Sequence, residues 1–310
     1  EGYMGEPRQR PPYPIERGIY GKPTCINNVE TWANVPQIID EGGTAYAAVG
    51  TEKSTGTKVF SLVGKIKNTG LVEVPMGITI KEIIYDIGGG PADGAKIKAV
   101  QIGGPSGGCV PARLADTRIN YEDLAAAGTM MGSGGMVVLD ETDCMVDVAR
   151  YFMSFTRMES CGKCTFCRVG TVRMLEILEK LCRGEGCAED VRDLKSLGEK
   201  MQRGSLCGLG KTAPHPVLSS IQYFPEEYEA HISGICPAGK CGPLIRYRIT
   251  ADCIGCTRCA QLCPAEAIPF TPYEEHVIND EKCTRCNTCK NICPADAVVI
   301  EPRNAPEADG

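Results

Sequence analysis

The sequence has 310 residues, 43% hydrophobic and 23% charged, which is long enough for two to four globular domains. Its net charge of -6 argues against a nucleic-acid partner, because contacts to phosphates need a basic face. No stretch approaches the ~20 apolar residues of a membrane span, and residues 1–10 contain no apolar signal-peptide core. We therefore expect a cytoplasmic protein without a membrane span.

The first half of the chain predicts an irregular segment, a helix and a small α+β domain. Five prolines make residues 1–24 irregular, whereas residues 24–42 carry apolar side chains at helical spacing. Residues 79–87 are predicted to form a short helix that ends at three glycines, and the glycine-rich run 103–108 a turn. Four short apolar runs are predicted strands: residues 59–63, 71–74, 100–102 and 136–139.

The second half predicts four helices followed by a cysteine-rich module. The helices are separated by glycines and are expected at residues 144–158, 166–181, 188–201 and 214–231. Short connections between such helices indicate an up-down four-helix bundle. Short strands are expected from residue 243 onward, and residues 303–310 read as a polar, disordered tail.

The 19 cysteines are the unusual feature of the composition, and most of them follow residue 143 in Cys-x2-Cys clusters. Two cysteines separated by only two residues rarely form a structural disulfide with each other. Thiolates that bind one metal centre, in contrast, need that spacing. The chain is also long and lacks a secretion signal, so a disulfide framework is not expected. The cysteines therefore predict metal centres.

Eight cysteines form a two-cluster ferredoxin module. The motif Cys-x2-Cys-x2-Cys-x3-Cys-Pro begins at Cys253 and recurs 30 residues later at Cys283. Three thiolates on one loop bind three corners of a cubane, while the fourth serves the other cluster. Zinc also binds Cys-x2-Cys pairs, but it does not explain a third cysteine and a Cys-Pro in both copies. The predicted [4Fe–4S] ligand sets are Cys253, Cys256, Cys259 and Cys293, and Cys283, Cys286, Cys289 and Cys263.

A third ligand set is predicted in the helical region. Cys161, Cys164 and Cys167 share one loop, and the bundle topology places Cys207 at the same end. Three thiolates from one loop and one from across the bundle complete a set for a [4Fe–4S] cluster. Zinc is the alternative occupant.

Several motifs resemble one family, that of the flavoprotein subunit of respiratory complex I and its hydrogenase and formate dehydrogenase relatives. The resemblance covers nearly the whole chain up to about residue 232. It rests on ESCGKCTFCR at residues 159–168 with Cys207, GEPR at 5–8, GKPTCINNVET at 21–31, GSGGM at 132–136 and DCMV at 143–146.

The resemblance implies an α+β multidomain protein. Its domains would be a C-terminal remnant of an FMN-binding domain (1–55), a β-grasp, ubiquitin-like (SLBB-like) domain (56–142), a four-helix bundle with a [4Fe–4S] cluster (143–233), a linker with a candidate zinc site (234–248), a 2[4Fe–4S] ferredoxin domain (249–302) and a tail (303–310).

The resemblance also implies a flavin site that this sequence does not complete. Asn27 and Asn28 would lie near the FMN phosphate, although they could instead cap the helix that follows. The family's glycine-rich FMN loop and acidic nicotinamide motif are absent from the sequence. We therefore expect FMN and NAD(P) only in the intact subunit, and no flavin-dependent activity from this chain alone.

A zinc site is predicted where the helical region meets the ferredoxin module. His231, Cys236 and Cys241 are close in sequence, and Cys144 is expected at the same end of the bundle. Cys187 is the second choice for the fourth ligand, and Cys182 lies at that end too. The alternative is a solvated His231 beside buried or inert thiols. Two further cysteines, Cys25 and Cys109, are expected to be small core residues.

The fusion of a ferredoxin module resembles the β subunit of NAD(P)-linked, electron-bifurcating [FeFe]-hydrogenases. That resemblance implies electron relay between a flavin/NAD(P)H site, iron–sulfur clusters and soluble ferredoxin. The implied partners are a hydrogenase-type catalytic subunit and a small thioredoxin-like [2Fe–2S] subunit. The alternatives are an NAD-dependent formate dehydrogenase β subunit and a purely structural subunit held together by its clusters.

Overall fold

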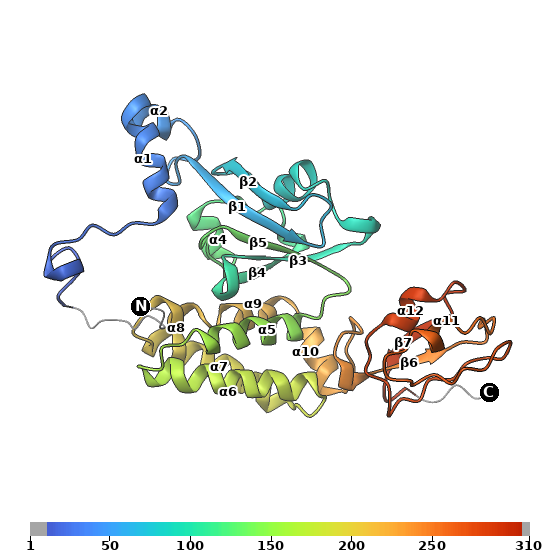
Figure 1. Ribbon diagram of the computed structural model, residues 1–310. Coiled ribbons are helices and arrows are strands. Elements are labelled where there is room, and N and C mark those ends of the chain that lie inside the picture. The colour runs from blue at the N-terminus through green and yellow to red at the C-terminus, as the bar shows by residue number, and fades with distance from the viewer. Residues whose placement is uncertain (1–10, 306–310) are drawn as a thin grey trace.

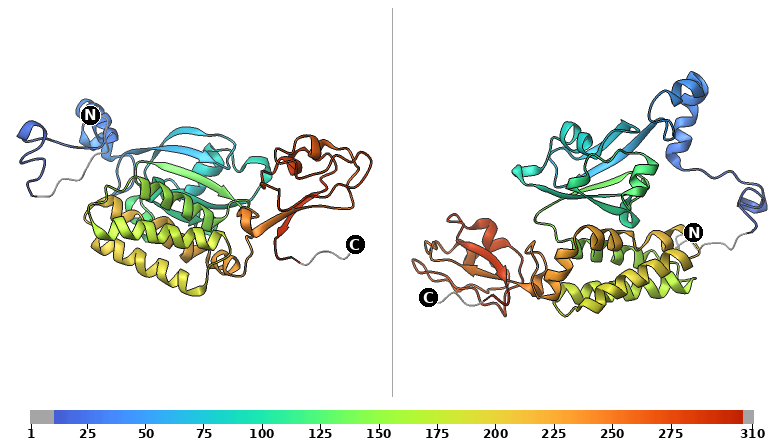
Figure 2. Two further views of the ribbon diagram at one scale, coloured as in Figure 1. Left: turned by 60° about the horizontal axis from the view of Figure 1, so that its bottom comes forward. Right: turned by 180° about the vertical axis from the view of Figure 1, so that it is seen from behind.

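The computed structural model describes residues 11–305. The first ten residues of the expected irregular segment, with the GEPR motif, lie outside this range, as do residues 306–310 of the expected tail. A β-sheet domain lies along one side of a layer of helices, and the cysteine-rich module is attached at one end of that layer (Figure 1). Two further views show the same arrangement, with the N-terminal segment at the other end (Figure 2).

The N-terminal segment contains η1 (Ile19–Gly21), α1 (Val29–Glu41) and α2 (Gly43–Ala47). The helix predicted at residues 24–42 therefore begins five residues later than expected. Thr24 is instead tied into a turn, where its hydroxyl accepts from the Ile19 amide at 2.9 Å and donates to the Lys22 carbonyl at 3.0 Å. Helix α1 has no buried side chain, but its Glu30 carboxylate accepts from the Val59 amide at 2.8 Å and so joins it to the sheet.

The sheet domain contains five strands in the order β2-β1-β5-β3-β4. The neighbouring strands β1 and β5 are parallel, and the other neighbours are antiparallel. The strands are β1 (Thr57–Gly64), β2 (Gly70–Pro75), β3 (Ile97–Ile102), β4 (Gly108–Pro111) and β5 (Gly135–Asp140). Strand β4 was not predicted, because only four residues remain after the glycine-rich turn.

Short helices cover the sheet. The helix predicted at residues 79–87 starts as α3 (Ile80–Glu82) and continues as the π-helix η2 (Ile83–Ile87). Thr79 and Glu82 form a capping box, which satisfies two backbone amides at its start. The remaining short helices are η3 (Ala92–Gly94), η4 (Gly104–Ser106), η5 (Ala112–Leu114) and α4 (Tyr121–Ala126).

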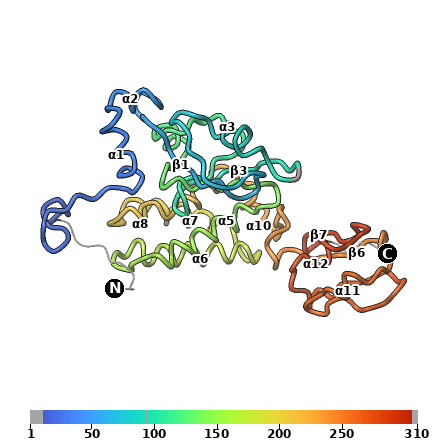
Figure 3. The backbone as a smooth tube through the Cα atoms, turned by 45° about the horizontal axis from the view of Figure 1, so that its top comes forward, coloured from blue at the N-terminus to red at the C-terminus, as the bar shows by residue number. Residues whose placement is uncertain are grey.

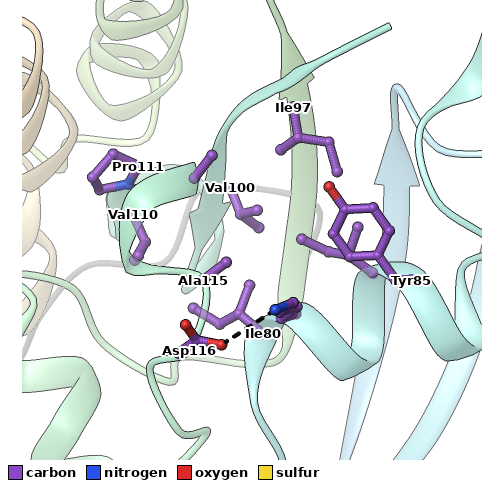
Figure 4. Close-up of a pocket in the computed structure, with 11 residues that line it drawn as sticks. Ile80, Tyr85, Ile97, Val100, Val110, Pro111, Ala115 and Asp116 are labelled. Carbon is purple, nitrogen blue, oxygen red and sulfur yellow. Dashed lines mark ion pairs between the residues drawn. The ribbon is translucent and has the colours of Figure 1, made fainter. Parts of the chain in front are cut away.

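The turn predicted at residues 103–108 is present and depends on glycine. It contains η4, and a Cβ built on Gly107 would lie 1.8 Å from the Ile102 carbonyl oxygen. Between the sheet and the helix α3–η2 lies a cavity of about 150 Å³, lined mostly by aliphatic side chains, with the Lys81–Asp116 ion pair at 3.8 Å (Figure 4). No cysteine among the described residues lines this cavity.

The helical domain contains α5 (Met145–Met158), α6 (Thr165–Cys182), α7 (Ala188–Gly204), α8 (Gly208–Thr212), α9 (His215–Tyr223) and α10 (Pro225–Ile232). Helix α5 packs on α6, α6 on α7, α7 on α9, and α9 on α5. The helix predicted at residues 214–231 is broken in two. Phe224 leaves helical geometry, and Pro225 has no amide hydrogen to continue α9, so it begins α10 instead.

The sheet domain and the helical domain are joined by polar contacts. The Cys109 amide of β4 donates to the Ser219 hydroxyl of α9 at 3.0 Å. Lys98 of β3 pairs with Glu227 of α10 at 2.8 Å, and both side chains are largely buried. Cys109 is buried, as expected of a small core residue, whereas Cys25 is exposed and does not fit that prediction.

The C-terminal module contains little regular structure. After η6 (Gly242–Leu244), strands β6 (Ile245–Ile249) and β7 (Val298–Pro302) pair antiparallel, and α11 (Arg258–Gln261) and α12 (Thr288–Ile292) pack on each other. The backbone trace shows the module beyond α10, away from α8 (Figure 3). Among the described residues, no helix has both the length and the apolar character to cross a bilayer.

Candidate metal centres

The predicted helical-domain set lies around the starts of α6 and α8, at the end of the helices farthest from the C-terminal module (Figure 1). Cys164 is the N-cap of α6, Cys167 is in its first turn, and Cys207 is the N-cap of α8. Burial raises the pKa of Cys167, and the charges of Cys164, Cys207 and Cys161 raise it further, so the four sulfurs influence one another. The predicted set is therefore gathered from two segments 40 residues apart.

The backbone around this set favours thiolates. Burial raises the pKa of Cys164, but several hydrogen bonds, including those from the Leu206 and Cys167 amides, together bring it below its usual value. The Ser160 hydroxyl lies 3.3 Å from Cys167 Sγ. Arg168 closes the loop, because its Nη1 donates to the Gly162 carbonyl at 2.8 Å. Hydrogen bonds of this kind stabilise the negative charge of a thiolate, so they favour the deprotonated form of these cysteines.

The two loops of the C-terminal module repeat each other in detail. Ala267 and Ala297 donate their amides to Cys263 and Cys293 Sγ, both at 3.3 Å. Three pairs of residues, each 30 apart, have left-handed backbone conformations: Gly255 and Arg285, Thr257 and Asn287, and Glu266 and Asp296. These turns wrap each loop around a centre, so the pseudo-symmetry seen in the sequence extends to the backbone.

The module brings together the cysteines of the predicted second set and three cysteines of the first. One small cavity is lined by the thiols of the predicted second set, together with Tyr247. Those cysteines are Cys263, Cys283, Cys286 and Cys289. In the first set, burial raises the pKa of Cys259, and the charges of Cys253 and Cys256 add to the effect.

A separate, tighter site joins the helical domain to the module. Cys144, His231, Cys236 and Cys241 are all buried, and their ligand atoms lie within 4.8 Å of one another. His231 Nε2 is 3.3 Å from both Cys144 and Cys241 Sγ, and those two sulfurs are 3.8 Å apart. Tetrahedral zinc with bonds of about 2.3 Å to sulfur and about 2.0 Å to nitrogen needs about 3.8 Å between sulfurs and about 3.5 Å from sulfur to nitrogen.

The surrounding groups orient these four side chains. His231 Nδ1 lies 2.7 Å from the Glu227 carbonyl oxygen, which fixes the proton on Nδ1 and leaves the Nε2 lone pair facing the sulfurs. Amides of Lys240 and Cys241 donate to Cys236 Sγ at 3.3 and 3.4 Å. Without a metal, hydrogen bonds from the Cys144 and Cys241 thiols lower the pKa of Cys236.

The structure decides between the sequence alternatives for this site. His231 is fully buried, so it is not a solvated helix-terminal histidine. Cys187 is exposed and starts α7, where its amide donates to Asp190 at 2.7 Å, so it is not the fourth ligand. Cys182, which was expected at the same end of the bundle, is a buried neighbour of these residues, and a hydrogen bond with Cys241 lowers its pKa. It lines a cavity of about 350 Å³ next to the four residues.

The asparagines assigned to the flavin are not assembled into a site by the described residues. Asn28 is the N-cap of α1, but its side chain makes no capping hydrogen bond, so the capping alternative does not explain it. Asn27 donates to Cys25 Sγ at 3.4 Å. Both asparagines are exposed.

The ligand-atom spacings separate the two kinds of centre. Within residues 11–305, only the Cys144–His231–Cys236–Cys241 group brings three or more Cys, His, Asp or Glu ligand atoms that close together. No three sulfurs of an all-cysteine set in the described part of the chain lie that close together, which agrees better with ligands of a four-iron core than with ligands of a single zinc ion. The donor sets therefore fit three iron–sulfur clusters and one mononuclear ion.

Family models match three regions of the chain. Residues 147–231 match the NADH-ubiquinone oxidoreductase-F iron-sulfur binding region, residues 248–300 a 4Fe-4S dicluster domain, and residues 59–110 an SLBB domain. Fold and sites thus define an iron–sulfur protein in which an SLBB domain is joined to two 4Fe-4S regions.

The particular relatives are oxidoreductase subunits. The chain is 52% identical over 278 residues to the NADP-reducing hydrogenase subunit HndC of Solidesulfovibrio fructosivorans, covering 89% of this chain and 57% of that protein. It is 42% identical over 234 residues to the F subunit of NADH-quinone oxidoreductase from Mycobacterium tuberculosis, covering 76% and 52%. The chain spans about half the length of these curated relatives.

A solved structure gives the same picture. The crystal structure of an NAD+-reducing [NiFe]-hydrogenase in the air-oxidized state aligns with a TM-score of 0.67 and 34% identity. The alignment covers 73% of this chain and 38% of that chain. The chain is therefore a homologue of hydrogenase and NADH-quinone oxidoreductase subunits.

Proposed function

We propose that this chain is the iron–sulfur relay subunit of an NAD(P)-linked hydrogenase. The observation that carries the proposal is the presence, in one chain, of three separate all-thiol sets with backbone amides directed at their sulfurs. Such sets fit [4Fe–4S] clusters, which supply one-electron redox chemistry when bound. The chain's own residues hold the sulfurs apart, donate hydrogen bonds to them and limit their contact with water.

The extent of similarity favours a hydrogenase over complex I. The match to HndC includes 278 of the 310 residues, so it must extend into the C-terminal module. The match to the F subunit of NADH-quinone oxidoreductase includes 234 residues. The proposal accordingly keeps the electron-bifurcating [FeFe] type, with soluble ferredoxin, a catalytic hydrogenase subunit and a thioredoxin-like [2Fe–2S] subunit as partners.

The junction site is proposed to hold a structural zinc ion. Four protein ligands leave no open position for a substrate or a water, which distinguishes a structural site from a catalytic one. Two ligands come from the helical domain and two from the segment that leads to the module. Cys144, His231, Cys236 and Cys241 would therefore fix the module to the helices.

The flavin end of the proposal rests on the family resemblance. Asn27 and Asn28 are proposed to lie near the FMN phosphate, where FMN would link NAD(P)H to the helical-domain cluster. Their exposure leaves them available to a group beyond the described residues. An NAD-dependent formate dehydrogenase β subunit remains the alternative, and the identity of co-purifying subunits distinguishes the two.

Metal analysis and redox titration of the full chain test the proposal. We expect about twelve irons and one zinc per chain, and three spectroscopically distinct centres that accept one electron each. Clusters that stay oxidised under every low-potential donor would refute the relay and leave a purely structural role. A chain that carries iron but no zinc would remove only the junction-site proposal.

A further inference from the structure

Two different side chains occupy equivalent positions in the pseudo-symmetric module. The Thr250 amide donates to the Ala297 carbonyl, and the Asn279 amide donates to the Ala267 carbonyl, both at 2.8 Å. Because Ala267 and Ala297 are 30 residues apart in the repeat, Thr250 and Asn279 are equivalent. The residues three positions before them are Tyr247 and His276, and both are buried.

The ring of Tyr247 faces the second cysteine set, whereas its hydroxyl contacts a side chain other than a cysteine. It lines the same cavity as Cys263 and the second loop of cysteines. Burial and the nearby cysteine charges raise the pKa of Tyr247 to about 12. Its hydroxyl donates to Asn287 Oδ1 at 3.0 Å, so its hydrogen is already used. Tyr247 therefore gives its cluster an aromatic wall.

His276 gives the first cysteine set a polar wall instead. The residue is only 2% exposed, and its Nδ1 lies 3.6 Å from Cys253 Sγ. Its Nε2 is buried and has no hydrogen-bond partner among residues 11–305. Within the described residues, the polar contact of the His276 imidazole is therefore the one with Cys253, a predicted cluster ligand. A cluster-bound thiolate carries no proton and can only accept, so the facing Nδ1 must carry the hydrogen.

We propose that His276 donates a hydrogen bond to Cys253 and thereby raises the reduction potential of the cluster held by Cys253, Cys256, Cys259 and Cys293. This inference rests on the cluster assignment in the proposed function. Reduction adds negative charge to the cluster and its sulfurs, so a donor to sulfur stabilises the reduced state more than the oxidised state. His276 is a positioning residue that acts through Cys253, and the effect is confined to one of two otherwise similar centres.

The second set has a polar contact of its own, which supplies a matched comparison. The Thr288 hydroxyl lies 3.3 Å from Cys286 Sγ, on the loop that faces Tyr247. Thr288→Val should therefore change only the second centre, and His276→Phe only the first. Tyr247→Phe keeps the aromatic wall and should change neither potential to a comparable extent.

Potentiometric titration of the full-length holoprotein, followed by EPR, tests the proposal. His276→Phe should lower the ratio of reduced to oxidised protein at one module cluster about tenfold at fixed potential, equivalent to about 59 mV for a one-electron couple. His276→Gln, which retains an N–H donor, should recover most of that loss. Equal potentials in wild type and His276→Phe, or a shift of both module clusters together, would overturn the proposal.

A second measurement remains decisive if His276→Phe loses its cluster. In wild-type protein labelled with ¹⁵N-histidine, pulsed EPR of the reduced state should show nitrogen coupling at one module cluster only. Absence of that coupling would contradict the hydrogen bond. If no cluster can be reduced at all, the relay function fails. If the clusters titrate normally but ignore His276, only this inference fails.

Discussion

Replacing Glu227 by Gln should loosen the contact between the sheet domain and the start of α5. The Glu227 carboxylate pairs with Lys98 at 2.8 Å and accepts from the Met145 amide at 2.8 Å, with its side chain 6% exposed. Gln can still accept from the amide, but it cannot neutralise Lys98, whose side chain is 16% exposed. Removing one partner of a buried pair costs about 3–5 kcal/mol. Lys98 keeps the Asp143 carbonyl at 2.5 Å, so we expect about 3 kcal/mol.

Native-state hydrogen exchange is the suitable assay, because a multidomain chain has no single unfolding free energy. A loss of about 3 kcal/mol predicts roughly 100-fold faster exchange of the protected amides at the start of α5 and in α10. Lys98→Met combined with Glu227→Gln should cost less than the two single changes added together. The exposed Arg173–Glu176 pair is the control, and its loss should cost at most about 0.5 kcal/mol.

The reasoning fails if Glu227→Gln leaves exchange at the start of α5 within threefold of wild type, or if the single effects simply add. Either result would mean that water solvates Lys98 in the native state despite its low exposure. A loss in the Arg173 control of the same size would show instead that the assay reports charge in general.

Three further predictions concern the module and the junction site. His231→Ala should remove the single zinc but leave the iron content unchanged, and proteolysis should then cut between residues 233 and 244; wild-type protease resistance in a zinc-free protein would contradict this. Gly255→Ala should lose about four irons per chain, because its backbone has φ +64 and a new Cβ would lie 2.6 Å from Tyr273 Cα, whereas Gly43→Ala, with no atom within 4 Å, should keep them all. Arg248 and Arg246 hold the pKa of Glu301 below its usual range despite the opposing effect of burial, so β6–β7 pairing should weaken as the pH falls through that depressed folded-state pKa and be fully present above the unfolded value. Amide exchange in β6 should show that acid loss in wild type, and equal acid sensitivity in Glu301→Gln would refute it.

The sequence was most informative where chemistry demands fixed spacing. The Cys-x2-Cys loops and helix lengths predicted which thiols share an end of the helical domain, and the structure brings Cys144 to His231 although they are 87 residues apart. Periodicity could not place helix ends, so it missed the break at Pro225 and the late start of α1. The sequence also left Cys187 as a possible zinc ligand, but the structure shows this residue exposed at the start of α7.

The contacts that sequence reasoning missed depend on loop conformation. His276 lies in a segment without regular structure, so no periodicity indicates which way its ring points. Its position became interpretable only through the backbone bonds that relate Asn279 to Thr250. From the sequence alone, Glu227 cannot be distinguished from an exposed carboxylate on a helix surface. The structure shows that Lys98 of the sheet domain lies beside it. Tertiary contacts between distant segments, rather than local preferences, decided these cases.

In the proposed relay, the junction-site zinc would connect the two parts of the chain that hold the cluster ligands. Cys144 begins α5 and Cys161 follows its end, so the 14 residues of the helix separate the junction site from the helical-domain set by about 21 Å. The module is attached at the junction end (Figure 1). Zinc has no accessible redox chemistry. It can therefore hold the module against the helices without itself accepting an electron, whereas an iron centre at this point would accept one.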